Sequence, residues 1–228
     1  RYPLVTGVQT CALPISLKVG GYHLHVSRRS KMAIEGVKFD VHVEAHGECH
    51  DHDHGDSDAH GHGHAHDHDH AHDHAHGRSF AQIRAILEGA PLTPWARQKA
   101  VAVFHRIAVA EGKIHGVPPE RVAFHEVGAV DSIVDIVAAC IALDLLGRPA
   151  VSAGDVVEGT GFVRCAHGRM PLPAPATLEI LGARGIPLSQ CEEPHEMLTP
   201  TGAALLADRK STRLNSSHEW ISRMPSSA

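Results

Sequence analysis

The sequence predicts an α+β fold in which helices pack with short antiparallel strands, and three observations carry that prediction. Segments 22–30 and 37–45 alternate apolar and polar residues, as half-buried strands do. Segments 80–89, 94–114 and 132–146 have apolar residues at helical spacing. Strands and helices do not follow a regular βαβ period, which disfavours a doubly wound parallel sheet.

The two strand segments are joined by a short link that contains Gly36, and we expect them to pair as an antiparallel hairpin. A lone hairpin is only marginally stable in water, so this one needs a packing partner. We assign residues 17–45 to part of an N-terminal domain.

The helical segments begin and end at recognisable signals. Ser79 and Gln82 form a capping-box pattern before the first segment, and Gly89 marks its end. Thr93 followed by Pro94 combines an N-cap with proline at the first helical position. These signals predict that both helices start where their apolar periodicity starts.

The remaining elements are shorter. Residues 155–165 and 186–191 contain strand candidates, and the proline-rich stretch 171–177 leads into a short helix. Thr199 with Pro200 opens the last helix. We therefore assign residues 78–207 to an α+β core.

A histidine-rich tract over residues 46–77 is the strongest chemical signal. It contains nothing apolar to bury, so we expect a disordered insertion. Imidazole binds nickel, zinc, copper and cobalt, and the interleaved carboxylates offset the charge of a divalent ion. A tag or a neutral repeat expansion is the alternative. The predicted metal ligands are His46, His50, His52, His54, His60, His62, His64, His66, His68, His70, His72, His74 and His76. Outside the tract, His105 and His115 are expected to face solvent.

The overall composition excludes several classes of protein. The chain has 228 residues with 26 acidic and 21 basic side chains, and the acidic excess lies in the tract. The near-neutral remainder argues against a nucleic-acid-binding surface. No segment offers the ~20 apolar residues of a membrane span, and no signal-peptide pattern opens the chain. Scattered cysteines without a CxxC pair fit reduced thiols, so we expect a cytoplasmic protein.

The two ends look foreign to the rest of the chain. Residues 5–15 and 208–218 resemble the translated strands of a common DNA-sequencing adapter, facing inward from opposite ends. We interpret residues 1–16 and 208–228 as an assembly artefact.

Four side chains surround the start of the third predicted helix. Asp131 and Asp135 are four residues apart and share a helix face. The two carboxylates repel each other unless a cation or the helix dipole offsets their charge. We therefore predict that they form a divalent-cation or acid–base site with His125 and Glu126. The alternatives are an ordinary N-cap for Asp131 and a structural histidine for His125.

Two further segments have the chemistry of anion sites. Gly159 and Gly161 precede His167, and glycines let backbone N–H groups approach a phosphate closely. Thr199 and Thr201 put hydroxyls and free N–H groups at a helix start. Tight turns and helix capping are the alternatives.

Four blocks of sequence, in order, resemble one known family. They read HGRSFAQI, FHEVGAVDSIVDIV, AHGRMPLPAPAT and EMLTPTGAALL. Together with the histidine-rich insertion, they resemble the nickel-insertion proteins of nickel-pincer-cofactor biosynthesis, the LarC family, over about residues 17–207.

The resemblance implies a specific activity. Such proteins insert Ni(II) into pyridinium-3,5-bisthiocarboxylic acid mononucleotide, forming Ni–C and Ni–S bonds, while CTP with Mg or Mn is hydrolysed to CMP and pyrophosphate. The product serves a lactate racemase-type apoenzyme. On this reading His125, Glu126 and Asp131 are catalytic candidates, and Asp135 is a metal ligand. Removing the C–H proton needs a general base, which His125 or Glu126 would supply.

The resemblance also has gaps. The family's opening D-x-x-x-G-x-x-G-D-M pattern and its C-terminal region, implicated in nucleotide binding and oligomer formation, do not appear in this sequence. We therefore interpret the chain as the middle of such a protein, inactive alone and homo-oligomeric at full length. The competing hypothesis is a non-enzymatic nickel or zinc chaperone or store that needs only the tract.

Overall fold

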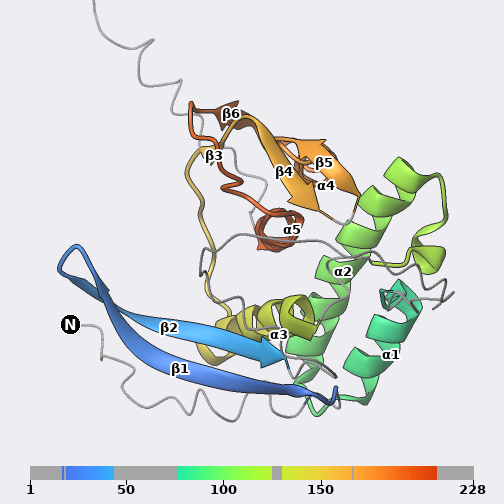
Figure 1. Ribbon diagram of the computed structural model, residues 1–228. Coiled ribbons are helices and arrows are strands. Elements are labelled where there is room, and N and C mark those ends of the chain that lie inside the picture. Colours follow the sequence, from blue (N-terminus) through green and yellow to red (C-terminus); the bar gives the residue numbers. More distant parts are fainter. Residues whose placement is uncertain (1–16, 18, 44–76, 125–129, 166, 210–228) are drawn as a thin grey trace, which may run out of the picture.

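The computed structural model describes residues 17, 19–43, 77–124, 130–165 and 167–209. Five α-helices lie in these ranges: α1 (Phe80–Gly89), α2 (Pro94–His115), α3 (Val130–Leu145), α4 (Pro175–Gly182) and α5 (Pro200–Arg209), with a short 3-10 helix at Pro119–Arg121. Together with short strands they confirm the predicted α+β class. The long helix α2 contacts each of the other four, as Figure 1 shows.

The predicted start signals of the first two helices are confirmed. The backbone N–H of Gln82 donates to the Ser79 hydroxyl at 3.2 Å, and that of Ser79 donates to the Gln82 side chain at 2.7 Å. Thr93 accepts from the backbone N–H of Ala96 at 3.1 Å, with Pro94 as the first residue of α2. Local hydrogen bonding therefore fixes where both helices begin.

The core forms where α2 packs against α1, α3 and α5. Phe104 and Ile107 of α2 and Ile133 and Ile136 of α3 are fully buried. Burial of each such side chain contributes about 1.5–3 kcal/mol. The helix α3 begins at Val130, slightly before the predicted start.

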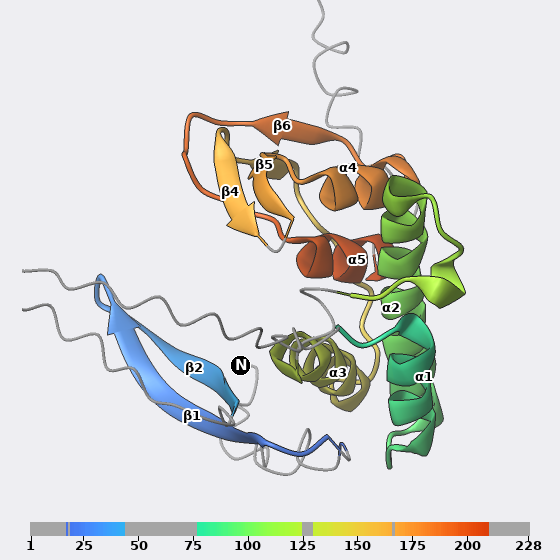
Figure 2. The same cartoon turned by 45° about the vertical axis from the view of Figure 1, so that its right-hand side comes forward.

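The strands β1 (Tyr22–Lys31) and β2 (Ile34–Val43) form the predicted antiparallel hairpin, with Tyr22 opposite Val43 and Lys31 opposite Ile34. Its inner face packs against the helical core, mainly next to α3, which supplies the partner that a lone hairpin lacks. The far end curves away from the helices, and Met32 at its turn is 91% exposed (Figure 2).

The remaining strands form two small sheets. β3 (Val156–Glu158) pairs in parallel with β6 (Leu188–Gln190), and β4 (Phe162–Cys165) pairs antiparallel with β5 (Gly168–Pro171). The strand candidate at 155–165 is thus two strands that belong to different sheets. The parallel pairing was not expected, because it joins residues about thirty positions apart. β5 was not expected either, because its sequence has no alternating pattern.

The last helix continues past the expected boundary at Asp208. The Asp208 side chain is 4% exposed and pairs with Lys99 at 3.4 Å and Arg106 at 3.5 Å on α2, and with Arg209 at 3.0 Å. Residues 1–16 and 210–228, the rest of the predicted foreign ends, lie outside the described residues.

No helix in the described part of the chain has the length and apolar character needed to cross a membrane.

Candidate functional site

A cavity of about 460 Å³ lies where the last turns of α2, the start of α3, the β4–β5 hairpin and the first residues of α4 and α5 meet. In Figure 1 the C-terminal end of α2 lies next to this hairpin. Six carboxylate, guanidinium or imidazole side chains line the cavity: Glu111, His115, Asp135, Arg164, His167 and Glu196.

Four of the predicted site residues line this one cavity. Asp135 comes from α3, His167 from the turn between β4 and β5, and Thr199 and Thr201 from the start of α5. The fold therefore brings together three segments that are far apart in the sequence. Their roles as metal or cofactor ligands stay predictions.

Asp135 has the electrostatic character of a site residue. Partial burial raises the pKa of its carboxyl above the ordinary value, and the nearby Asp131 carboxylate raises it further. Asp135 is therefore a better proton acceptor than an ordinary surface carboxylate, and a nearby cation would favour its ionised form.

The other predicted residues do not line the cavity. Asp131 is exposed in the first turn of α3, where its carboxylate accepts the backbone N–H of Ser132 at 2.7 Å. Gly159 and Gly161 lie outside the lining. His125, Glu126 and the histidine-rich tract fall outside the described residues. Phe124, directly before the segment 125–129, and Ser132, three residues after it, line the cavity.

His115 is exposed as predicted, but its neighbours were not predicted. Its side chain is 37% exposed, lines the cavity, and places Nε2 3.2 Å from the Glu111 carboxylate one helical turn earlier. Its ring stacks on that of His167, with centroids 4.9 Å apart and planes 29° apart. The i,i+4 spacing of Glu111 and His115 was the signal that could have identified this pair. His105 is also exposed, as expected.

Glu158 is a structural residue that the sequence analysis missed. It is fully buried, and its carboxylate accepts backbone N–H groups from Gly159 at 2.8 Å, Met197 at 2.6 Å and Leu198 at 2.9 Å. The segment it holds lies between Glu196 and Thr199, which both line the cavity. Glu158 therefore fixes one wall of the cavity from behind.

Gly159 explains why the chain can make this contact. A Cβ at this position would overlap the carbonyl oxygens of Glu193 and His195. The backbone N–H of Thr160 also donates to the Glu193 carbonyl at 2.8 Å. Gly159 is thus used for close approach of backbone to backbone.

The start of α5 is capped and lies next to the cavity. The Thr199 hydroxyl accepts the backbone N–H of Gly202 at 3.2 Å, so it caps the helix. The partial positive charge of the helix N-terminus lies next to the cavity. This charge and Arg164 complement an anion, whereas Glu111, Asp135 and Glu196 complement a cation.

No three or more His, Cys, Asp or Glu side chains of the described residues already form a metal site. The cavity as described is therefore a place where a cation and an anionic molecule can meet, without a closed resident metal site.

Comparison with known proteins identifies the family. Residues 9–220 match the family described as nickel insertion protein. Relatives named for nickel insertion include one from Geobacter sulfurreducens, 42% identical over 85% of this chain and 42% of the relative. Another, from Myxococcus xanthus, is 44% identical over 83% of this chain and 42% of the relative.

A third relative has a more specific name. The pyridinium-3,5-bisthiocarboxylic acid mononucleotide nickel insertion protein of Geobacillus kaustophilus is 41% identical over 88% of this chain and 44% of its own length. No solved structure matches. The chain spans less than half the length of these relatives. Because the match covers nearly the whole chain, the chain belongs to the nickel insertion protein family.

Proposed function

We propose that this chain takes part in nickel insertion into pyridinium-3,5-bisthiocarboxylic acid mononucleotide, and that the cavity is where metal and pyridinium substrate meet. The observation that carries the proposal is the convergence of Asp135, His167 and Thr199 on one cavity with Glu111 and His115. The name of the Geobacillus kaustophilus relative supplies the substrate.

The cavity has separate groups for the two reactants. Imidazole and carboxylate are suitable ligands for Ni(II), and the His115–His167 pair with Asp135 supplies both. The substrate carries a phosphate and two thiocarboxylates, which Arg164 and the first turn of α5 would attract.

The chemistry also requires a proton acceptor. Forming the Ni–C bond replaces a hydrogen on the pyridinium ring with nickel, and the hydrogen leaves as a proton. His125 and Glu126 are the two candidates for this base that the sequence predicts. Asp135 becomes a third candidate, because its raised pKa improves a carboxylate as a proton acceptor.

CTP with Mg or Mn is a further part of the proposal, supported by the family resemblance. As arranged in the described residues, no three or more His, Cys, Asp or Glu side chains form a group that could hold the nucleotide's metal ion. No step of the chemistry at this cavity is therefore assigned to the nucleotide or its metal.

The test is an insertion assay in this chain joined to the remaining length of its relatives, read out as reactivation of lactate racemase apoenzyme. His125→Ala, Glu126→Gln, Asp131→Asn and His167→Ala should each lower insertion at least ~10-fold, a loss of ~1.4 kcal/mol in transition-state stabilisation. His105→Ala is the matched control, because His105 is exposed away from the cavity.

The alternative, a nickel chaperone or store, predicts another pattern. Deleting residues 47–76 should only raise the nickel concentration that an insertion enzyme requires. Normal insertion activity in all four single-residue variants would favour the chaperone if the deletion abolished activity at saturating nickel.

A further inference from the structure

The β1–β2 hairpin has one apolar and one histidine-bearing face at its base. Leu24 and Val41 lie on the inner face and pack against the core. His23, His25 and His42 lie on the outer face and are exposed. Because side chains alternate along a strand, the same alternation that buries the inner face holds these imidazoles in solvent.

The strand register brings the three histidines and an aspartate into one group. His23 lies directly opposite His42, and His25 lies directly opposite Asp40 in the next outward-facing pair. The rings of His23 and His42 are nearly parallel, at 9°, with centroids 5.0 Å apart. The His25 ring meets that of His42 edge-on at 6.1 Å.

These spacings suit a shared metal ion. Each metal–nitrogen bond to imidazole is about 2.1 Å, so two ligating nitrogens lie about 3–4 Å apart. The ring centroids of His23 and His42 are 5.0 Å apart, and tilting the rings brings one nitrogen of each to within about 3–4 Å of the other. Exposed side chains are free to make this change of rotamer. In their present rotamers, no three or more His, Cys, Asp or Glu side chains of the described residues form a group that could hold a metal ion, so these side chains must rotate to bind one.

The charge of Lys38 lowers the affinity of this site for a divalent ion. Lys38 lies on the same face and contacts the Asp40 carboxylate at 2.7 Å. Its ammonium repels a divalent ion and occupies one carboxylate oxygen. The imidazoles are therefore the primary ligands, and Asp40 mainly offsets charge.

The three hairpin histidines lie close in sequence to the histidine-rich tract. The histidine-rich tract begins at His46, four residues after His42, a length of chain that spans at most about 14 Å. An ion released by the first tract histidines is thus within reach of a folded set of ligands.

We propose that His23, His25 and His42, with Asp40 beside them, form a binding site for one nickel-class divalent ion on the outer face of the hairpin. The site is separate from the tract and from the cavity. It does not depend on the proposed insertion activity.

The experiment uses the full 228-residue chain with the thirteen tract histidines replaced by glutamine and with Cys49→Ser. Ni(II) is titrated by calorimetry and by amide NMR, in which the paramagnetic ion broadens nearby signals. We expect broadening of residues 22–25 and 40–43 at the lowest nickel additions. His23→Gln with His42→Gln should lower the affinity of that binding event at least 10-fold.

Two controls separate this site from the others. His105→Gln removes an exposed histidine of α2 and should leave the affinity unchanged, whereas Lys38→Gln should raise it. The hairpin substitutions are on exposed positions, and circular dichroism checks that the fold is retained. Broadening confined to cavity residues, or affinity within twofold after His23→Gln with His42→Gln, would overturn the proposal and leave the cavity hypothesis standing.

Discussion

Replacing the buried Glu158 with glutamine should strongly destabilise the protein. The buried carboxylate accepts N–H groups from Gly159, Met197 and Leu198, so it joins β3 to the chain that leads into α5. Glutamine has nearly the same shape, but one carboxylate oxygen becomes an NH₂ donor.

The magnitude follows from the three hydrogen bonds. If the glutamine oxygen takes the Oε1 position, the bonds from Gly159 and Met197 become neutral, at a loss of about 1 kcal/mol each. The N–H of Leu198 then faces another donor, which costs about 1–3 kcal/mol for an unsatisfied buried group. The sum is about 3–5 kcal/mol, a large part of the 5–15 kcal/mol typical of a folded domain.

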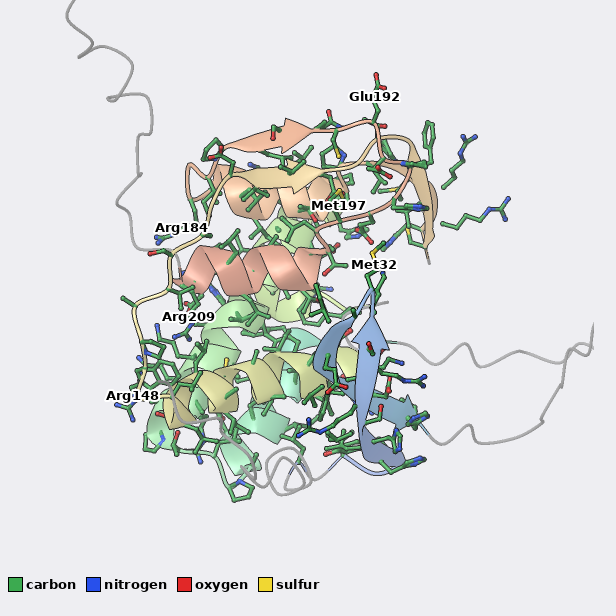
Figure 3. The ribbon with its side chains drawn as sticks, turned by 90° about the vertical axis from the view of Figure 1, so that its left-hand side faces the viewer. Met32, Arg148, Arg184, Glu192, Met197 and Arg209 are labelled. Carbon is green, nitrogen blue, oxygen red and sulfur yellow. The ribbon has the colours of Figure 1, made fainter. Side chains whose placement is uncertain are left out.

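The assay is urea unfolding followed by circular dichroism, with a thermal scan in parallel. A loss of this size corresponds to a fall in Tm of roughly 6–20 °C for a chain of this length. Glu192→Gln is the matched control, since Glu192 lies two residues beyond β6 and points away from the molecule (Figure 3). Its effect should stay within about 0.5 kcal/mol.

Below the transition temperature the same variant should bind ligands at the cavity more weakly, because Glu196 and Thr199 flank the released segment. Equal stability of the Glu158→Gln and Glu192→Gln proteins would refute the reasoning that Glu158 holds this wall.

Three further predictions follow from other groups. Burial raises the pKa of Cys140 to about 11, so roughly one thiol in a thousand is ionised at pH 8. Iodoacetamide should therefore label Cys191 in the folded protein but Cys140 only after unfolding, as peptide mass spectrometry will show; prompt labelling of Cys140 contradicts its burial. Burial and Asp131 raise the pKa of Asp135, so the stability that Asp135 contributes falls as pH rises from its unfolded pKa through its folded one. Asp131→Asn should lower the pKa of Asp135 and lessen that loss, which a carboxyl NMR titration checks; an unchanged pKa refutes the coupling. Deleting residues 47–76 should remove most of the Ni(II) stoichiometry with the core intact, and unchanged stoichiometry in calorimetry would show that the tract is not the main ligand source.

The sequence was informative wherever a structural signal is local. The capping box at Ser79 and Gln82 and the Thr93–Pro94 start involve residues within one helical turn. The hairpin was predicted because alternation reports directly on which side is buried. The strand β5 carries no such pattern, and the parallel pairing of β3 with β6 joins residues about thirty positions apart.

Several residues of the cavity could be predicted from the chemistry of their side chains, but the positions of others in the fold could not. Asp135, His167, Thr199 and Thr201 were selected for what their side chains can do, and the fold places all four on one cavity. The exposure of His115 was predicted, but its place in the cavity wall was not, because periodicity reports only whether a helix face belongs to the core. The β4–β5 hairpin, through His167, packs against the exposed C-terminal end of α2 and makes that end a wall of the cavity. No sequence pattern within α2 indicates that contact.

Gly159 shows how a correct structural cue can suggest the wrong partner. A glycine that must allow close approach was expected to face a phosphate, and a close approach is what the structure has. The group that comes close is the backbone of Glu193 and His195, and the adjacent buried Glu158 secures the chain that follows. The loop therefore acts on the cavity indirectly, through the position of Glu196 and Thr199. Substituting Gly159 should consequently impair folding of this wall first, and any loss of ligand binding should follow from that loss.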